Sequence, residues 1–517
     1  MVVIDRWLET AGNKGVLDGL MAKNSPLQIP CFEKLLYPGS VQRANKTVYV
    51  LARFDETDML GIFCRGTRES EGFHGIKKNI GKGSALFCPL DHENAKTLRK
   101  VLPFTAPARL AGHGTSFGTG DRLGIAAPGH IHGLRNYRVW PVLAQQSVRE
   151  IELTSRSFEE ALDSVTWAVF REGFTRPWGA DGDHLKTEEW VKKVLALGYS
   201  MITADVSEYI KEEYARAGSS EICASFERLP REVRRVLESN YFEKRIEISQ
   251  DVIIHFSSEE LVRAALIYWD APQQAARLYR AGVEVCGEDE FDFELSIDET
   301  AIPTTPLAHA FIAMELQRRR IRPFSFAPRF IGSFQKAVDY IGDADKFVSS
   351  LKVHAAIAKH FGYRISVHSG SDKFRIYPAI GEITEGRFHL KTSGTSWLEA
   401  LKVIGEVDPF LFQSIYEHAK ENAPQALRFY RIKIQPDALP ESNIINKKGV
   451  SELFESPDVR KLLHISYGEI LKHPELRTKI YAVLKRNIEE YWKRLEVHIG
   501  SHLECLGLRK NTGEPDD

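Results

Sequence analysis

Acidic, basic and histidine side chains recur in this sequence where a short apolar segment gives way to a loop rich in Gly and Ser. The clearest case is the stretch 291–304, in which Phe293 and Leu295 alternate with acidic residues ahead of Asp298 and Glu299. Such period-two alternation predicts a β-strand with one apolar face. An acidic pair after a strand can cap a helix or form part of a site, and its recurrence along the chain favours a site.

The histidines at these positions, together with one acid, have the chemistry of a divalent-metal site. The predicted ligands are His184, Glu299, His368 and His389. Mixed nitrogen and oxygen ligands suit Zn, Mn, Co or Ni, and three protein ligands leave positions open for a chelating substrate. Each histidine taken alone is more often a structural imidazole, so the prediction depends on the set as a whole.

The other candidates divide into catalytic acids and substrate-binding groups. Asp121, Asp183 and Asp298 are the predicted catalytic carboxylates. The predicted substrate-binding residues are Arg122, Gln145, Gln146, Arg329, Ser369, Lys373 and Lys391. The basic side chains among them suit an anionic substrate, although they could instead pair with the acids. The segment 368–374 has a second interpretation as an anion-binding loop that presents backbone N–H groups.

Eight repeats of strand and amphipathic helix would bring these residues together. The predicted strands lie in the segments 109–118, 138–147, 176–184, 200–210, 291–297, 322–330, 363–374 and 386–396. A (β/α)8 barrel gathers the loops after its strands on one face, which explains polar groups at every strand end. A doubly wound sheet also alternates strands and helices but does not require them. The predicted fold class is therefore α/β, a (β/α)8 TIM-type barrel.

The barrel is predicted to span residues 106–420, with other parts of the chain around it. Residues 1–105 have strand and helix patterns without a catalytic constellation and are predicted to form an N-terminal α+β accessory region. Residues 421–517 are predicted to be a C-terminal helical extension. The segment at about 208–290 is too long for one crossover and is predicted to be a helical insertion. Residues 336–362 are predicted to be helical.

The composition argues against several kinds of partner. The 517 residues include 69 Lys and Arg against 70 Asp and Glu, a net charge of -1, so neither nucleic acid nor an acidic membrane surface is expected. No apolar run approaches the ~20 residues of a membrane span, and the charged N-terminus does not resemble a signal peptide. Six scattered cysteines suit free thiols in a cytoplasmic protein. A homo-oligomer is compatible with these properties, and the polar tail after Arg509 is expected to be disordered.

Seven segments, in order between about residue 113 and residue 468, resemble the tagaturonate epimerase family. They are SFGTGDRLG, LAQQSVRE, ADGDHLK, SIDETAIPTTP, SVHSGSDKFRIYP, FHLKTSGTSWLEA and HISYGEIL. The resemblance implies a metal-dependent sugar-acid epimerase that interconverts D-tagaturonate and D-fructuronate. Related proteins also act on fructose and tagatose, so the implied partner is a small sugar acid or a ketohexose.

This reaction constrains the mechanism, because the two sugar acids differ at C4 while the ketone is at C2. The C4 hydrogen is not acidic, so enolisation cannot invert this carbon. Retro-aldol cleavage of C3–C4 and re-addition could do so, as could transient oxidation at C4. The chain has no dinucleotide fingerprint, so we favour the metal-assisted retro-aldol route and expect no nicotinamide cofactor. Asp183 or Asp298 would be the base, and Arg122, Lys373 or Lys391 would bind the C6 carboxylate.

Three other functions are compatible with the same residues. A metal-dependent ketose isomerase would use the same barrel and ligands, and a class II aldolase would share the first chemical step. A sugar-acid-binding sensor without turnover is the non-enzymatic alternative. The large number of ionisable groups at strand ends argues against the sensor, because binding alone rarely needs so many.

Overall fold

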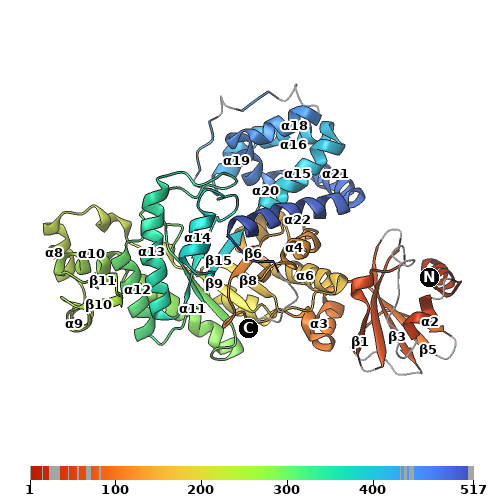
Figure 1. Ribbon diagram of the computed structural model, residues 1–517, viewed down its shortest axis with the longest axis horizontal. Helices are drawn as coiled ribbons and strands as arrows, with labels where there is room; N and C mark the ends of the chain where they lie inside the picture. Colours follow the sequence, from red (N-terminus) through yellow and green to blue (C-terminus); the bar gives the residue numbers. More distant parts are fainter. Residues whose placement is uncertain are drawn as a thin grey trace.

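The computed structural model describes most of the chain and shows a central barrel with three attached parts (Figure 1). The described residues are 2–13, 16–21, 35–44, 46–54, 57–65, 72–80, 83–430, 432–435, 439–441 and 447–510. The tail beyond residue 510, which the sequence predicts to be disordered, lies outside them. A small β-sheet lies at one end of the molecule, an inserted region lies at the other, and C-terminal helices cover one side of the barrel.

Eight parallel strands close the barrel, in the order β12-β13-β14-β15-β6-β7-β8-β9. Their bounds are β6 (Ser116–Thr119), β7 (Trp140–Ser147), β8 (Gly179–Leu185), β9 (Met201–Asp205), β12 (Asp292–Ser296), β13 (Ser325–Ala327), β14 (Arg364–Val367) and β15 (Phe388–Thr392). The (β/α)8 barrel predicted from the sequence is therefore confirmed. β6 is shorter than the predicted segment, because the glycine-containing residues before Ser116 form a loop.

The alternation seen in β12 explains how the barrel is packed. Phe293 faces outward, where its ring lies 5.3 Å from that of Tyr279 on a surrounding helix. Glu294 faces inward and accepts hydrogen bonds from the hydroxyls of Thr203 and Ser325 on the two neighbouring strands. The interior of this barrel is therefore polar and charged, while the apolar faces of its strands pack on the helices.

Helices surround the barrel, and five of the eight begin at a residue whose side chain accepts a hydrogen bond from a backbone N–H of the first turn. They are α4 (Ala127–Leu134), α5 (Val148–Thr154), α6 (Phe158–Glu172), α7 (Glu188–Ala196), α12 (Pro306–Arg318), α13 (Ala344–Phe361), α14 (Tyr377–Ile383) and α15 (Thr395–Val407). The prediction of a helix from residue 336 was wrong over its first eight positions. Asp343 caps α13 by accepting hydrogen bonds from the backbone N–H groups of Asp345 and Lys346, so the residues before it form a loop.

The inserted region between β9 and β12 is not entirely helical. It contains α8 (Ser219–Glu227), α9 (Arg231–Asn240), α10 (Ser258–Tyr268) and α11 (Asp270–Cys286). An antiparallel hairpin of β10 (Arg245–Ser249) and β11 (Val252–His255) lies between α9 and α10. The prediction missed this hairpin, because its strands are short and charged helical segments flank them.

The N-terminal part is an antiparallel sheet with helices on it. Its elements are α1 (Val2–Asn13), α2 (Val16–Met21), β1 (Gln42–Ala44), β2 (Thr47–Ala52), β3 (Met59–Arg65), β4 (Ile76–Ile80), β5 (Gly83–Cys88) and α3 (His92–Val101). The strand order is β1-β2-β3-β5-β4. Trp7 of α1 packs against Phe63 and Phe87 of this sheet, with ring centroids 6.2 and 5.6 Å away.

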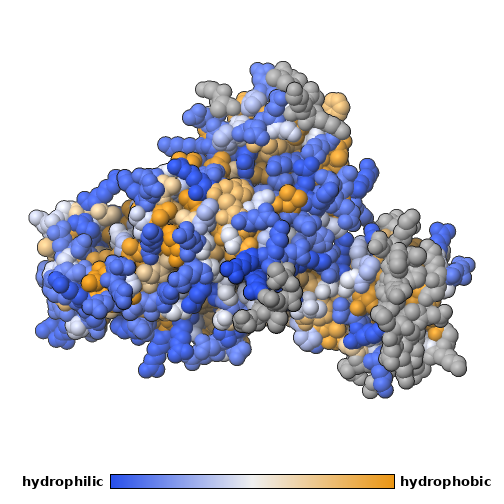
Figure 2. Space-filling view, viewed as in Figure 1, coloured by the Kyte–Doolittle hydropathy of each residue, from blue (hydrophilic) through white to orange (hydrophobic). Residues whose placement is uncertain are grey.

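The C-terminal helices pack on the barrel through a close helix pair. They are α16 (Pro409–Glu421), α17 (Ala423–Leu427), α18 (Lys447–Glu455), α19 (Pro457–Ile465), α20 (Tyr467–Lys472), α21 (Pro474–Arg486) and α22 (Ile488–Cys505). Gly129 and Gly133 of α4 let α22 approach closely, since a Cβ at either position would lie 2.9 Å or less from Leu495 or Ile499. Figure 2 shows a largely hydrophilic face of the molecule, with hydrophobic residues gathered near its centre.

Two further expectations concern the described residues as a group. None of their helices combines the length and the apolar composition needed to cross a bilayer. Five of the six cysteines are described, and all five are free thiols. Cys31 lies outside the described residues.

Candidate active site

A cavity of about 850 Å³ opens at the carboxyl ends of the barrel strands. Most of the predicted site residues line it, from strands or loops far apart in the sequence. They are Gln145, Asp183, His184, Asp298, Glu299, Arg329, His368, Ser369 and Lys391. The strand-end rule therefore gathers residues that are separated by up to about 250 positions in the chain.

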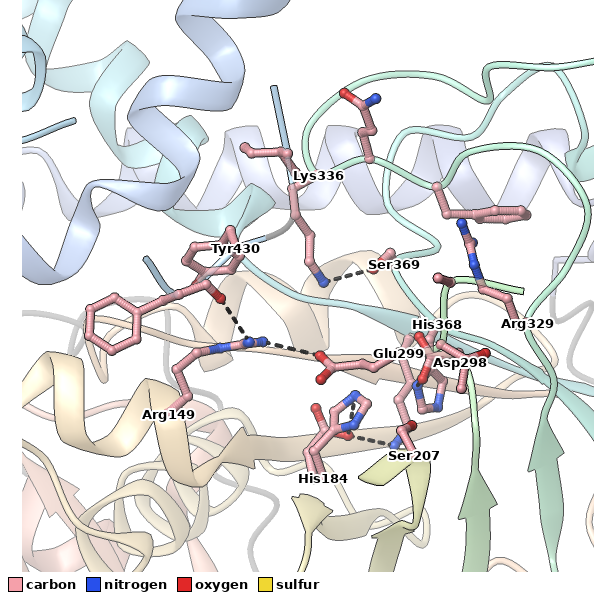
Figure 3. Close-up of a pocket in the computed structure, with 18 of the residues that line it drawn as sticks. Arg149, His184, Ser207, Asp298, Glu299, Arg329, Lys336, His368, Ser369 and Tyr430 are labelled. Carbon is pink, nitrogen blue, oxygen red and sulfur yellow. Dashed lines mark hydrogen bonds and ion pairs between the residues drawn. The ribbon is translucent and has the colours of Figure 1, made fainter. Parts of the chain in front are cut away.

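Two histidines and a carboxylate meet at the floor of the cavity (Figure 3). His184, Asp298 and His368 each offer a ligand atom within 4.8 Å of the other two. The imidazole rings of His184 and His368 lie 5.0 Å apart, nearly perpendicular to each other. A second group of the same kind joins His184 to Asp205 and Glu299. The spacing and the mixed nitrogen and oxygen donors fit a divalent cation.

Carboxylates behind the two histidine rings support this interpretation. Nδ1 of His184 lies 3.3 Å from a carboxylate oxygen of Asp205, and Nε2 of His368 lies 2.6 Å from Glu294. A histidine that donates one N–H to a carboxylate leaves its other nitrogen available to a metal ion. The available nitrogens are then Nε2 of His184 and Nδ1 of His368, which lies 2.9 Å from Asp298.

The electrostatics of this cluster also favour a cation. Burial alone would lower the pKa of His184 and of His368, but the surrounding carboxylates raise these pKa values to about 10 and about 9. Burial would likewise raise the pKa of Asp298, yet His368 holds it well below its usual range. The cluster has an excess of negative charge that two imidazolium protons balance, and a divalent cation would supply the same charge.

His184 and Ser369 adopt unusual backbone conformations at this site. Their φ angles are 51° and 50°, in the left-handed region that non-glycine residues seldom occupy. Strained backbone of this kind concentrates at binding and catalytic sites, where the surrounding structure holds it in place.

Lys391 enters the cavity from below and is surrounded by carboxylates. Its Nζ lies 2.7 Å from Asp181, 2.8 Å from Asp183 and 2.8 Å from Glu294. Burial raises the pKa of Asp181 to about 6, whereas Lys391 outweighs the effect of burial on Asp183 and holds its pKa well below the usual range. The prediction that Lys391 binds a substrate carboxylate is therefore corrected, because three acids of the protein already neutralise this ammonium.

Arg122 and Asp121 lie away from the cavity. Nε of Arg122 lies 3.0 Å from Glu150, and its guanidinium donates to the carbonyl of His464 and stacks 3.7 Å from the Tyr467 ring centroid. The Asp121 carboxylate accepts three backbone N–H groups, those of Leu123, Gly124 and Ala126. Both predictions are corrected: Arg122 joins the C-terminal helices to the barrel, and Asp121 stabilises the turn before α4.

Lys373 is also saturated by the protein. Its Nζ donates hydrogen bonds to the backbone carbonyls of Gln335, Val338 and Ser371, which uses all three N–H groups of the ammonium. Burial lowers the pKa of this side chain to about 7. Lys373 therefore holds the loop before α13 and does not present a free charge to a ligand, which corrects its predicted role.

Gln146 and His389 also lie outside the cavity, which corrects their predicted roles. Gln146 donates to the carbonyl of Asp121 at 2.9 Å and lies outside the cavity. His389 lies two residues deeper in the barrel than Lys391, where its Nδ1 is 2.9 Å from the hydroxyl of Ser116. Burial lowers the pKa of His389 to about 3. A histidine two positions earlier on a strand points to the same face but one layer lower, so His389 does not reach the ligand cluster.

Four cations that line the cavity were not among the predicted site residues: Arg149, Lys186, Lys336 and Arg428. Nζ of Lys336 lies 2.7 Å from the hydroxyl of Ser369. The guanidinium of Arg149 lies 4.7 Å from the Tyr430 ring centroid and 3.7 Å from Glu299 (Figure 3). Lys336 was predicted to lie in a helix, so it was not considered as a site residue. Arg149 belongs to the LAQQSVRE segment and follows a predicted strand closely enough that the strand-end rule could have found it.

An eight-stranded parallel barrel with a histidine–carboxylate cluster below a cationic wall defines the class of protein: a barrel enzyme that acts on a small polar molecule. The sequence profile of tagaturonate epimerase, UxaE, matches residues 37–506. A tagaturonate/fructuronate epimerase of Thermotoga maritima is 38% identical to this chain over 473 residues, which are 91% of this chain and 96% of that protein. The chain therefore belongs to the tagaturonate epimerase family, and the resemblance seen in its motifs is confirmed.

Solved structures agree with this assignment. The native crystal structure of fructuronate-tagaturonate epimerase UxaE from Cohnella laeviribosi has a TM-score of 0.87 at 37% identity, covering 92% of this chain and 96% of that chain. A glycerol complex of the same protein also has a TM-score of 0.87 and covers 97% of that chain. The chain is accordingly an enzyme of the isomerase class, an epimerase.

Proposed function

We propose that this enzyme interconverts D-tagaturonate and D-fructuronate by inverting C4 through retro-aldol cleavage and re-addition. The observation that supports the proposal is a cavity with a cluster of histidines and carboxylates at its floor and cations on its wall, in a chain 38% identical to a tagaturonate/fructuronate epimerase. A 2-keto sugar acid has complementary ends: oxygens that chelate a cation at one end, and a carboxylate at the other. Turnover of fructose and tagatose belongs to the same proposal.

His184, Asp298 and His368 would hold a divalent cation, with Glu299 at the edge of the group. Zn, Mn, Co and Ni all suit these donors. When bound, such an ion supplies positive charge beside the oxygens at the ketone end of the substrate. Asp298, predicted as a catalytic acid, is here proposed as a metal ligand instead, because its carboxylate lies 2.9 Å from Nδ1 of His368.

Asp183 is then the base that receives the proton of the C4 hydroxyl. It lines the cavity, 3.9 Å from Nε2 of His184, and the neighbouring Lys391 keeps it ionised at neutral pH. As the proton leaves, the C4 oxygen forms a carbonyl, the C3–C4 bond breaks, and its electron pair remains on the C1–C3 fragment. Re-addition to the other face of the aldehyde forms the bond again, and Asp183 returns the proton to the C4 oxygen.

Incubation of the purified protein with a divalent cation and D-fructuronate tests this proposal. We expect D-tagaturonate to accumulate until an equilibrium mixture forms, as followed by chromatography or NMR. A ketose isomerase would instead exchange hydrogen at C1 with solvent, and a class II aldolase would release three-carbon fragments. A sensor would bind the sugar acid without turnover. Stoichiometric nicotinamide released from the denatured protein would contradict the retro-aldol route and favour transient oxidation at C4.

The metal ligands can be tested separately from turnover. His184→Ala and Glu299→Ala are each expected to lose bound divalent metal and activity together while remaining folded, as judged by metal analysis and circular dichroism. Both side chains project from strand ends or loops into the cavity, so their removal leaves the apolar core unchanged. Full activity with unchanged metal stoichiometry would remove that residue from the ligand set.

A further inference from the structure

The charged groups of the cavity are arranged as a floor and a wall. The floor is acidic and contains Asp183, Asp205, Asp298 and Glu299. Cations reach the cavity mainly from the loops, and they differ in how well the protein neutralises them. Lys186, for example, lies 2.6 Å from the carboxylate of Glu208, which also lines the cavity.

Like Arg329, which donates to the carbonyl of Gly332, Lys336 lines the cavity without a carboxylate partner among the described residues. Its Nζ lies 2.7 Å from the neutral hydroxyl of Ser369, and within the described part of the chain no carboxylate forms an ion pair with it. Burial lowers the pKa of Lys336, and the neighbouring positive charge of Arg149 lowers it further. A half-buried ammonium with one neutral partner has lost part of its hydration without gaining a counterion, which is costly unless an anion binds beside it.

The position of Lys336 fits a ligand anion. Its side chain reaches down from the loop before α13 toward Ser369, while His184, Asp298 and His368 lie lower in the cavity (Figure 3). Ser369 is directly adjacent in sequence to His368, so a molecule that contacts the Ser369 hydroxyl is also close to the predicted metal ligands.

We propose that Lys336, paired with Ser369 and assisted by Arg149, binds the C6 carboxylate of the sugar acid and so determines the preference for uronates over neutral ketohexoses. This inference rests on the proposed function of the same cavity. An ammonium offers a point charge, and the guanidinium of Arg149 can add a planar donor. The three residues corrected above, Arg122, Lys373 and Lys391, are each satisfied by protein groups and cannot take this role.

The same contact would retain the intermediate. After C3–C4 cleavage, the C4–C6 fragment is an aldehyde that carries the carboxylate. Rotation about its C4–C5 bond exposes the opposite face of the aldehyde without moving the carboxylate. Lys336 would therefore hold the fragment at its fixed end while C4 turns, which keeps it in the cavity for re-addition.

The test compares two lysine variants on charged and neutral substrates. Lys336→Met is expected to lower kcat/KM for D-fructuronate by about ten- to a hundredfold, mostly through KM, because one charge-assisted hydrogen bond is lost. The affinity for D-fructose, measured by competition against D-fructuronate, and the affinity for the divalent cation should stay within about twofold. Lys336→Arg should recover part of the lost activity. Lys211→Met is the matched control, because this lysine pairs with Asp270 and does not line the cavity.

Four results would overturn the inference. They are full fructuronate turnover in Lys336→Met, equal losses on fructuronate and fructose, loss of the metal, and the same effect in Lys211→Met. If the wild-type protein does not epimerise fructuronate, the proposed function fails. Calorimetric binding of D-fructuronate to the metal-loaded Lys336→Met and wild-type proteins still decides whether this lysine binds the carboxylate.

Discussion

Lys391 and Lys336 reach the same cavity from two different regions, the barrel interior and the loop wall above it. Lys391 belongs to a strand and has three carboxylates within 2.8 Å of its Nζ. Lys336 belongs to a loop and has one hydroxyl partner. Both lysines line the same cavity, yet one is neutralised by carboxylates of the protein and the other is available to a ligand.

The difference shows that the charge state of a residue does not reveal its role until its partners are known. A buried cation surrounded by acids holds those acids together, and losing it leaves their charges uncompensated. A cation with a neutral partner can bind an anion without first breaking an ion pair. The following predictions test this contrast between the interior and the wall.

Removal of the interior charge should have the largest effect. Lys391→Met leaves Asp181, Asp183 and Glu294 buried together, and breaking a buried ion pair typically costs about 3–5 kcal/mol of the free energy of unfolding. We expect a much lower midpoint of denaturant-induced unfolding and no turnover of either substrate. Lys211→Met, which removes a half-exposed pair, should cost no more than about 1 kcal/mol. Equal stability of the two variants would contradict the structural role of Lys391.

The carboxylate behind His184 should matter next. Asp205→Asn weakens the hydrogen bond that orients the ring, and loss of such a partner typically lowers metal affinity by about ten- to a hundredfold. Competition with a chromogenic chelator measures this affinity without any need for turnover. Glu208→Gln is the control, since Glu208 lines the cavity but pairs with Lys186. An Asp205→Asn protein with wild-type metal affinity would show that Asp205 does not orient a ligand.

Among the wall cations, Arg149 should contribute less than Lys336 to kcat/KM for D-fructuronate. Its guanidinium already shares its charge with Glu299 and donates to the carbonyl of Phe429, so less of it is available to a substrate. Arg149→Met is expected to lower kcat/KM for D-fructuronate by about two- to fivefold. A loss larger than that of Lys336→Met would reverse the order of the two residues and make Arg149 the main carboxylate partner.

Lys373 should have no effect on selectivity. Its three N–H groups are used by backbone carbonyls, so Lys373→Met is expected to destabilise the loop and to lower turnover of fructuronate and fructose by the same factor. Rates on both substrates, measured side by side, check this prediction. A selective loss on fructuronate would mean that Lys373 leaves its carbonyls when substrate binds.

The barrel and the floor of the site could be predicted from the sequence because both follow from strand periodicity. The alternation around Glu294 identifies an inward face, and residues at or just beyond strand ends, such as His184 and Asp298, must meet at the top of the barrel. The depth of a residue within the barrel was harder to predict. His389 points to the inward face as expected, but it lies one layer below the ligand cluster.

Lys336 on the wall could not be predicted in the same way, because its role depends on a loop and on partners distant in sequence. Lys336 and Lys373 are both lysines in loops, and nothing local distinguishes them. Lys373 is saturated only because the loop before α13 folds over it, and that loop was assigned to a helix. Whether a charge is satisfied is a property of the tertiary structure, which periodicity does not encode.

The orientation of the substrate is the central claim, and a crystal structure of the metal-loaded enzyme with D-fructuronate or D-tagaturonate tests it most directly. We predict that the C6 carboxylate lies within hydrogen-bond distance of Nζ of Lys336 and the hydroxyl of Ser369. The ketone end should lie at the metal held by His184, Asp298 and His368. A sugar acid bound in the reverse direction, with its carboxylate on the metal and no contact to Lys336, would contradict the account.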